Sequence, residues 1–391
     1  MAAIQPDLVA WRRHLHQHPE PSFAEYETTA FIEETLSGFG GLAIERPAKT
    51  GLVATLRGQG PGPVVAIRAD IDALPIEEEN RLDFRSSRPG VMHACGHDGH
   101  TAMLLGAAKV LSARPERLHG EVRFIFQHAE EQLPGGAEEL VRAGVMTGVD
   151  RVIGAHMEPG LPVGTFALRS GPVTASPDTF RIVVRGLGGH AADPHRAVDP
   201  IAVAAEVVSN LQMVVARYTS PQDALVLSVT RFIAGTADNI IPGSAELGGT
   251  VRSFDPKLRA EVPVWMERII RGVTEAHGAS YEFSYLNGYR SVVNDEAVTG
   301  LVRRSLVGCF GADAVVEAVP LMAGEDFSAY QTKAPGCFYQ VGCGNQAEGI
   351  TFPLHHPRFT LDEASLPVGV SAFVACITDW LGEPDRLSAL A

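Results

Sequence analysis

The 391-residue chain has no lysine- and arginine-rich run, and its 46 acidic and 32 basic side chains give a formal net charge of −14. Such a chain repels polyanions, so we expect no nucleic-acid partner. It also lacks an uninterrupted apolar run of about 18 residues and a basic segment followed by an apolar one at its N-terminus. We therefore expect no membrane partner and a cytoplasmic location.

Paired cysteines are missing as well. The chain has five cysteines, an odd number, and no Cys-x-x-Cys spacing. This suits a reducing compartment better than a disulfide framework. Four are interpreted as packing residues: Cys309, Cys337, Cys343 and Cys376. The fifth, Cys95, differs because it lies in the histidine-rich stretch MHACGHDGH.

No internal repeat or low-complexity tract organises the chain, and its length exceeds the size at which one hydrophobic core usually stops growing. We therefore expect two domains. Buried strands are predicted at 64–68, 122–126 and 151–156, and helices at 100–113 and 136–144. This alternation predicts an α/β fold with a mixed, largely parallel sheet.

A second unit is predicted to interrupt the first. Its periodic segments follow the order strand, helix, strand, strand, helix, strand, which is typical of a small open-faced α+β sandwich. We place this inserted domain at residues 177–289. The first domain is then discontinuous and consists of residues 1–176 and 290–391.

Each predicted strand of the first domain ends in polar residues that can bind metals. These are Asp70 and Asp72, Glu130 and Glu131, and His156. In open α/β sheets, ligands bind at the carboxyl ends of the strands, so we expect these side chains to converge.

Three interpretations of Cys95 are open. Its thiol lies two residues before His97 and near a helix start predicted at Asp98 or Thr101, where the helix dipole favours a thiolate nucleophile. A buried cysteine can also be an ordinary small hydrophobic residue. The nearby carboxylates and histidines have no place in a thiol mechanism, and they favour a metal site.

The residues are sufficient for a dinuclear site. Zinc-like ions take cysteine sulfur, histidine nitrogen and carboxylate oxygen. The candidate metal ligands are Cys95, His97, Glu131, His156 and His355. Two ions with a bridging water would polarise a scissile carbonyl and supply hydroxide near neutral pH. Glu130 would be the general base that takes the proton of the water and passes it to the leaving amine.

The remaining histidines have structural interpretations. We interpret His14, His16 and His18, on a predicted N-terminal helix, as solvated or capping residues. The others, His93, His100 and His128, are interpreted as structural residues or as supports of the ligands rather than as ligands.

Eight motifs, taken in order along the chain, resemble those of peptidase family M-twenty, subfamily D. They are RADIDALPI, MHACGHDGHTAML, FIFQHAEE with PGGAEELV, GAHMEPGLPVG, GGHAADPH with VDPI, NIIPGSAELGGTVRSF, GEDFSAY and LHHPRF. That branch contains N-acyl-amino-acid amidohydrolases, hippurate hydrolases and the plant auxin-conjugate hydrolases. The resemblance extends from LHQHPEPSF to HHPRF, nearly the whole chain.

The resemblance implies a co-catalytic metallopeptidase-like architecture in which the cysteine bridges two divalent ions. Cys95 would then lie between one ion also held by Glu131 and His355 and another held by His97 and His156. The metal could be zinc, manganese, cobalt or nickel. The inserted domain would be a lid and dimerisation domain, so we expect a homodimer or a higher homo-oligomer.

The resemblance also implies roles outside the ligand set. Glu130 matches the catalytic base, and His190 matches a donor to the developing oxyanion that reaches the active site of the partner subunit. Asn239 and Arg252 match residues that hold the carboxylate of the substrate.

The chain departs from the pattern of the branch at three positions. His355 fits the ligand position better than His356, which replaces a small polar residue. His128 and Leu187 replace a proline and a lysine; the first adds a possible stray ligand, and the second removes a cation near the lid.

The predicted activity is hydrolysis of the amide bond of N-acyl amino acids, with acetyl, benzoyl or aryl-acyl groups, or of small dipeptide-like amides. A non-catalytic amino-acid-conjugate binding protein on the same fold is the alternative, and a thiol hydrolase is the third hypothesis. The presence of Glu130 beside Glu131 argues against a binding protein, because binding needs no base.

Overall fold

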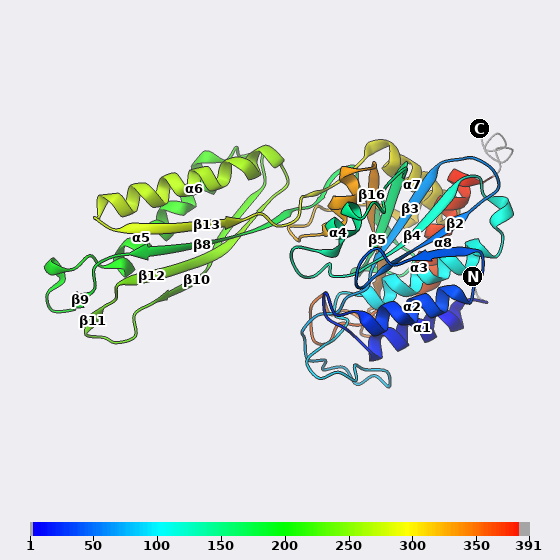
Figure 1. Cartoon of the computed structure of the whole chain (residues 1–391), viewed down its shortest axis with the longest axis horizontal. Helices are drawn as coiled ribbons and strands as arrows, with labels where there is room; N and C mark the ends of the chain where they lie inside the picture. Colours follow the sequence, from blue (N-terminus) through cyan, green and yellow to red (C-terminus); the bar gives the residue numbers. More distant parts are fainter. Residues whose placement is uncertain (1–2, 383–391) are drawn as a thin grey trace. The chain divides into compact units, whose positions relative to one another are not determined.

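The computed structural model describes residues 3–382, which form two compact units (Figure 1). Unit 1 is built from the described parts of Met1–Val173, Val292–Val319 and Asp326–Ala391. Unit 2 is built from Thr174–Ser291 and Pro320–Glu325.

The short segment Pro320–Glu325 lies outside the inserted domain that the sequence analysis placed at 177–289. It belongs to unit 2 because the backbone N–H of Ala175 donates to the carbonyl oxygens of Leu321 and Ala323, each at 3.0 Å. The sequence pattern missed this segment because six residues are too few to show a period.

Unit 1 contains an eight-stranded mixed sheet with the order β1-β2-β4-β3-β5-β16-β6-β15. Its central strands β4, β3, β5 and β16 are parallel to one another, whereas β1, β2 and β6 pair antiparallel with their neighbours β2, β4 and β16. In chain order the strands are β1 (Leu42–Glu45), β2 (Leu52–Arg57), β3 (Val64–Asp70), β4 (Glu121–Gln127), β5 (Arg151–Pro162), β6 (Phe166–Leu168), β15 (Val315–Glu317) and β16 (Gly336–Gly344). The predicted α/β fold with a mixed, largely parallel sheet is therefore confirmed.

Helices cover both faces of this sheet (Figure 1). One face packs against α2 (Tyr26–Ser37), α3 (His97–Ser112), α7 (Glu296–Phe310) and α8 (Ser365–Leu381), and α1 (Gln5–Gln17) packs on α3. The other face packs against α4 (Gly136–Arg142) and the 3₁₀ helix η5 (Asp326–Thr332). The central strands are consequently buried on both faces, which explains their continuous apolar sequences.

Two predicted boundaries were wrong. Strand β5 does not end at His156 but continues to Pro162, because β16 pairs with it up to Gly344. Helix α3 begins at His97 rather than at Asp98 or Thr101, after Gly96 with φ +86°. A side chain at Gly96 would be strained there and would also crowd Met157, with its Cβ 3.2 Å from the Met157 Cβ.

Unit 2 is a four-stranded antiparallel sheet, β10-β12-β8-β13, with two helices packed on one face. Its main elements are β8 (Ser176–Arg185), α5 (Pro200–Met213), β10 (Leu225–Ala234), β12 (Ser244–Ser253), α6 (Pro256–Ala276) and β13 (Ser280–Leu286). Two short strands, β9 (Gly189–His190) and β11 (Ile240–Ile241), pair with each other. The strands β7 (Gly171–Thr174) and β14 (Val292–Asn294) form a further pair at the points where the chain leaves and re-enters unit 1.

Among residues 3–382, no helix combines the length and apolar character needed to cross a membrane.

Two glycines of unit 2 provide a test of this packing. A Cβ atom at Gly249 on β12 would lie 2.1 Å from the Ser228 carbonyl oxygen and 2.5 Å from the Phe180 ring, whereas Gly272 on α6 has open space around it. We expect Gly249→Ala to destabilise the protein by about 1–3 kcal/mol through overpacking. Gly272→Ala should stabilise it by about 0.5–1 kcal/mol, because alanine favours the helix. Urea unfolding of both variants measures the difference, and equal stabilities would contradict the described strand contact.

Candidate metal centre

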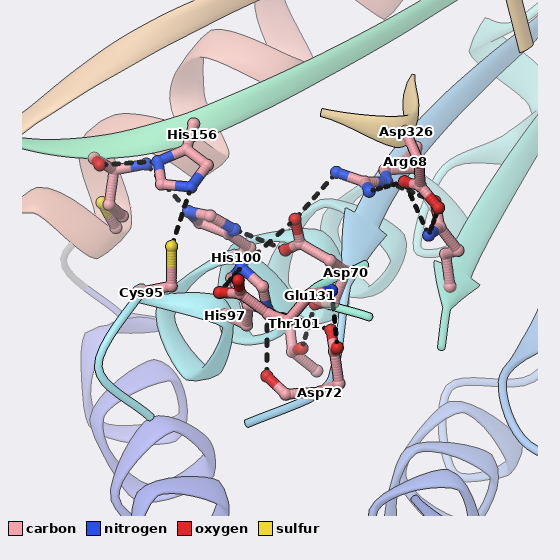
Figure 2. A network of polar contacts seen from close by, with 12 residues as sticks. Arg68, Asp70, Asp72, Cys95, His97, His100, Thr101, Glu131, His156 and Asp326 are labelled. Atoms are coloured by element: carbon pink, nitrogen blue, oxygen red, sulfur yellow. Dashed lines mark hydrogen bonds and ion pairs between the residues drawn. The ribbon is translucent and has the colours of Figure 1, made fainter. Parts of the chain in front are cut away.

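The polar residues predicted at the strand ends converge at one edge of the unit 1 sheet (Figure 2). Strand β3 ends at Asp70, with Asp72 just beyond it. Arg68 pairs with Gly154 in the parallel β3–β5 register, so His156, two residues further along β5, lies level with Asp70. Parallel strands thus bring these side chains to the same edge.

Cys95 lies at the centre of two overlapping groups of donor atoms. Its Sγ lies 3.4 Å from His156 Nε2 and 3.3 Å from His355 Nε2. The donor atoms of Cys95, His97 and His156 all lie within 4.8 Å of one another, and so do those of Cys95, Glu131 and His355. The structure therefore brings all five candidate ligands together, in two sets that share the sulfur.

Hydrogen bonds orient the two imidazoles on the α3 and β5 side. His97 Nδ1–H donates to the Asp72 carbonyl oxygen at 2.9 Å and lies 3.2 Å from Asp72 Oδ1, which leaves Nε2 directed toward Glu131 at 3.7 Å. His156 Nδ1–H donates to the Met157 carbonyl oxygen at 2.8 Å, which leaves Nε2 facing Cys95. In both rings the outward nitrogen therefore faces the cluster, and a metal would bind it in place of any proton that it carries.

Asp72 also fixes the glutamate side of the cluster. Its Oδ2 accepts the backbone N–H of Glu131 at 3.0 Å and the hydroxyl of Ser22 at 2.7 Å. Glu130, His97 and Glu131 form a further group of donor atoms within 4.8 Å. Glu130 thus lies next to the donor sets, as the sequence analysis expected of a base.

The pKa values reflect a buried site with several charges. Burial and the carboxylates of Glu131 and Glu130 raise the pKa of the Cys95 thiol well above its usual range. Burial disfavours the charged form of His97, but the nearby Asp70 and Asp72 carboxylates outweigh it and raise the pKa of His97 to about 10. The thiol of Cys95 and the imidazole of His97 therefore hold protons near neutral pH, which bound cations would displace.

Two orphaned atoms test whether the residues fit a metal. His97 Nε2 and Glu131 Oε1 are buried, and neither has a hydrogen-bond partner within residues 3–382. A buried polar atom left unpaired costs about 1–3 kcal/mol, and a cation bound to each donor set would satisfy both atoms. The donor chemistry, one thiol with imidazoles and a carboxylate, suits zinc-like ions. The residues present therefore fit a dinuclear metal centre.

A second set of buried groups, which includes His100, Arg68 and Asp326, lies beside the donor atoms (Figure 2). His100 Nδ1–H donates to Asp70 Oδ1 at 2.5 Å, and its Nε2 accepts the Met157 N–H at 2.8 Å. Arg68 bridges Asp70 Oδ2 and Asp326 Oδ1, each at 2.8 Å. Both nitrogens of His100 are thus occupied by protein groups, in agreement with its structural interpretation. The sequence analysis missed the roles of Arg68 and Asp326, which are 258 residues apart.

The other histidines do not join the donor sets. His356 stacks on Phe352 with ring centroids 4.5 Å apart, and His128 Nε2 lies 3.2 Å from Glu139 Oε2. At the end of α1, His18 Nδ1–H donates to the His14 carbonyl oxygen at 2.8 Å, which is a capping contact.

The solvated or capping interpretation was wrong for His16. This side chain is fully buried, and its ring nitrogens lie 2.9 Å from Asp98 Oδ2 and 3.1 Å from Glu78 Oε1. Burial opposes its positive charge, but these two carboxylates outweigh that effect and raise the pKa of His16. His16 and the equally buried Arg12, 2.8 Å from Asp98 Oδ2, anchor α1 to the first turn of α3.

The residues predicted to contact substrate lie in unit 2, at opposite ends of its sheet. His190 on β9 is exposed and pairs with Ile240, and the Asn239 carbonyl oxygen accepts the Ala191 N–H at 3.1 Å, so His190 and Asn239 are neighbours. Arg252 lies near the other end of β12, where Nη1–H donates to the Asp178 carbonyl oxygen at 3.3 Å. Partial burial lowers the pKa of Arg252.

The α/β sheet and the clustered thiol, imidazole and carboxylate donors define a metal-binding hydrolase. A sequence model of Peptidase family M20/M25/M40 matches residues 66–379, and the chain belongs to this family.

Three relatives illustrate the similarity. The N-acyl-L-amino acid amidohydrolase of Geobacillus stearothermophilus is 60% identical over 291 residues, which cover 74% of this chain and 79% of that protein. An N-acetylcysteine deacetylase of Bacillus subtilis is 45% identical over 372 residues, covering 95% and 96%. The crystal structure of the Bacillus subtilis YXEP protein, a dinuclear metal binding peptidase from the M20 family, has a TM-score of 0.85 and 41% identity, with 97% and 99% covered.

The contacts of Asp72 predict a loss of metal affinity when its side chain is removed. Asp72→Ala should weaken metal binding about 10–100-fold, because the Glu131 N–H loses its acceptor and His97 loses the carboxylate oxygen 3.2 Å from Nδ1, keeping only the Asp72 carbonyl oxygen. Ser22→Ala is the matched control, since it removes one bond to Asp72 and leaves the other two. Titration against a competing chelator measures the affinity, and an unchanged value for Asp72→Ala would show that the carboxylate does not orient the ligands.

Proposed function

We propose that this chain is a metal-dependent amidohydrolase that cleaves the amide bond of N-acyl amino acids, with acetyl, benzoyl or aryl-acyl groups, or of small dipeptide-like amides. The observation that carries the proposal is the position of the Cys95 sulfur, 3.4 Å from His156 Nε2 and 3.3 Å from His355 Nε2. With His97 and Glu131, it provides donors for two divalent ions that share one sulfur ligand.

Zinc, manganese, cobalt and nickel all suit such a mixed donor set. When bound, two such ions polarise the amide carbonyl and lower the pKa of water. The thiol of Cys95 is then a ligand and not a nucleophile. Its position supports this assignment, because Sγ lies within 3.4 Å of two imidazole nitrogens and is shared by the two donor sets.

Glu130 is assigned as the general base. Its carboxylate lies within the same 4.8 Å group as the donor atoms of His97 and Glu131, close to where water would react. It would accept the proton of the attacking water and then deliver it to the nitrogen of the leaving amine. The carbon–nitrogen bond breaks as that nitrogen is protonated, and the products are a carboxylic acid and a free amino acid.

Unit 2 supplies the groups that contact substrate. Arg252 would bind the carboxylate of the substrate by charge-assisted hydrogen bonds, with Asn239, the neighbour of His190, as a further donor from a second subunit. His190 would donate a hydrogen bond to the oxyanion that develops on the amide oxygen. Since the net charge of −14 gives no long-range attraction for an anionic substrate, this recognition has to be local.

The separation of these groups supports a homodimer or a higher homo-oligomer. On β8 and β12, Arg252 pairs with Pro177 and Ser244 with Arg185, and β9 follows beyond Arg185. Eight strand residues therefore separate Arg252 from the His190 end of the sheet, a distance of about 26 Å. A small substrate cannot bridge that distance, so His190 and Arg252 would serve one site only if they came from two subunits.

The names of the relatives support the substrate class. N-acyl-L-amino acid amidohydrolase and N-acetylcysteine deacetylase both denote removal of an acyl group from an amino acid.

The proposal predicts distinct outcomes for base and ligand. Against a panel of acetyl-, benzoyl- and indoleacetyl-amino acids, Glu130→Ala should retain both metals and lose roughly 10²–10⁴ in kcat, the usual contribution of a general base. Cys95→Ala should lose metal instead. The measurements are release of free amine and metal content after dialysis. Wild-type turnover by Glu130→Ala would show that Glu130 is not the base. Activity that survives exhaustive EDTA but not iodoacetamide would favour a thiol mechanism over the metal mechanism.

Subunit exchange tests whether His190 acts in the active site of the partner subunit. In a mixed dimer of Glu130→Ala and His190→Ala chains, one site would carry both defects and the other neither. Equilibrated mixing of these two low-activity variants should therefore restore about a quarter of wild-type activity, because about half the dimers hold one intact site of two. Mixing two differently tagged samples of Glu130→Ala is the control for exchange. No recovery despite demonstrated exchange would mean that His190 acts within its own chain or not at all.

A further inference from the structure

A buried carboxyl group, that of Glu25, contacts the backbone of the turn at residues 129–131, which carries Glu130. Glu25 is the residue before α2, and its side chain is fully buried in unit 1. Its Oε1 accepts the backbone N–H of Ala129 at 2.8 Å and that of Phe23 at 3.0 Å. Its Oε2 accepts the Thr50 hydroxyl at 2.8 Å. Glu25 therefore fixes the residue immediately before the proposed base.

The turn at Ala129 is one that the backbone would not adopt by itself. Ala129 has φ +48°, in the left-handed region that residues with a side chain rarely occupy. Such a conformation costs on the order of 1–3 kcal/mol and persists only where surrounding contacts hold it. The Ala129 N–H bonds to Glu25, and the Ala129 carbonyl oxygen accepts the N–H of Gly136 at 2.9 Å.

Two carboxyl groups thus bracket Glu130. Glu25 holds the amide of Ala129, and Asp72 Oδ2 holds the amide of Glu131 at 3.0 Å. Asp72 additionally binds the ligand His97, so its loss would disturb the metal centre. The side chain of Glu25 binds Phe23, Thr50 and Ala129, none of which is a candidate metal ligand, so its effect on Glu130 can be separated from an effect on metal binding.

We infer that Glu25 is a positioning residue for the base: it holds the left-handed turn at Ala129 and thereby aims the Glu130 carboxylate at the reacting water. This inference rests on the proposed function. Burial and the nearby Asp72 carboxylate also raise the pKa of Glu25 to about 7, so much of it is uncharged at neutral pH. An uncharged, isosteric glutamine should then accept the same two backbone N–H groups.

The test compares Glu25→Ala with Glu25→Gln and with a matched control, Glu20→Ala. Glu20 is also buried and also accepts a backbone N–H of α2, that of Thr28 at 2.8 Å, but its other carboxylate oxygen faces Arg88 rather than the 129–131 turn. We expect Glu25→Ala to lower kcat about 10²-fold with KM and metal content near wild type, since a small misplacement of a catalytic group costs about that much. Glu25→Gln should recover most of the lost rate, and Glu20→Ala should keep wild-type kcat.

If Glu25→Ala does not fold, Glu25→Asp replaces it, because the shorter side chain draws the acceptor back from Ala129.

A double-mutant cycle with Glu130 distinguishes positioning from a general structural effect. If Glu25 acts through Glu130, adding Glu25→Ala to Glu130→Ala should lower kcat no further. Wild-type kcat for Glu25→Ala, a loss equal to that of Glu20→Ala, or a full additional loss in the Glu130→Ala background would each overturn the inference. The proposed function fails separately, and first, if Glu130→Ala alone retains wild-type turnover.

Discussion

Two buried atoms that face each other without hydrogen-bond partners set the main constraint on this structure. His97 Nε2 and Glu131 Oε1 lie 3.7 Å apart, and within residues 3–382 neither has such a partner. The cluster cannot relax to pair them, because Asp72 holds the opposite side of the His97 ring and the backbone of Glu131. The surrounding protein therefore holds these two atoms at positions where bound cations would satisfy them, as the proposed metal centre requires.

The sheet supports this arrangement through a second buried layer. Arg68 on β3 is almost fully buried, and its charge is balanced by Asp70 and Asp326. A buried ion pair is costly unless its members are well paired and hydrogen-bonded. Here Asp70 is also bonded to His100, which in turn holds the backbone next to His156 through Met157. The candidate metal ligands are thus oriented by groups that are themselves fixed, so the geometry of the site depends on the order of the strands.

The sequence predicted the features that depend on short, repeated patterns. Alternating strands and helices gave the α/β fold, and the order of the motifs gave the family, and both are confirmed. The same reasoning placed Cys95 and His156 among converging residues, which lie together in the structure, while their chemical roles stay predictions. Features that depend on a distant partner were missed. His16 looked solvated because Asp98, its partner, is 82 residues away. No sequence pattern indicated a role for Glu25 either, because its partner Ala129 is 104 residues away in the chain.

The two units contribute to the proposed chemistry in different ways. The candidate ligands and Glu130 all lie in unit 1, held by hydrogen bonds at fixed distances, whereas the groups assigned to substrate recognition lie in unit 2. There the antiparallel pairing of β8 with β12 holds Arg252 and the His190 end about 26 Å apart. A paired sheet cannot shorten to bring both groups to one acyl amino acid. The proposed roles of His190 and Arg252 consequently require two copies of the chain, so that hydrolysis would depend on association although each copy carries all five candidate ligands and the proposed base.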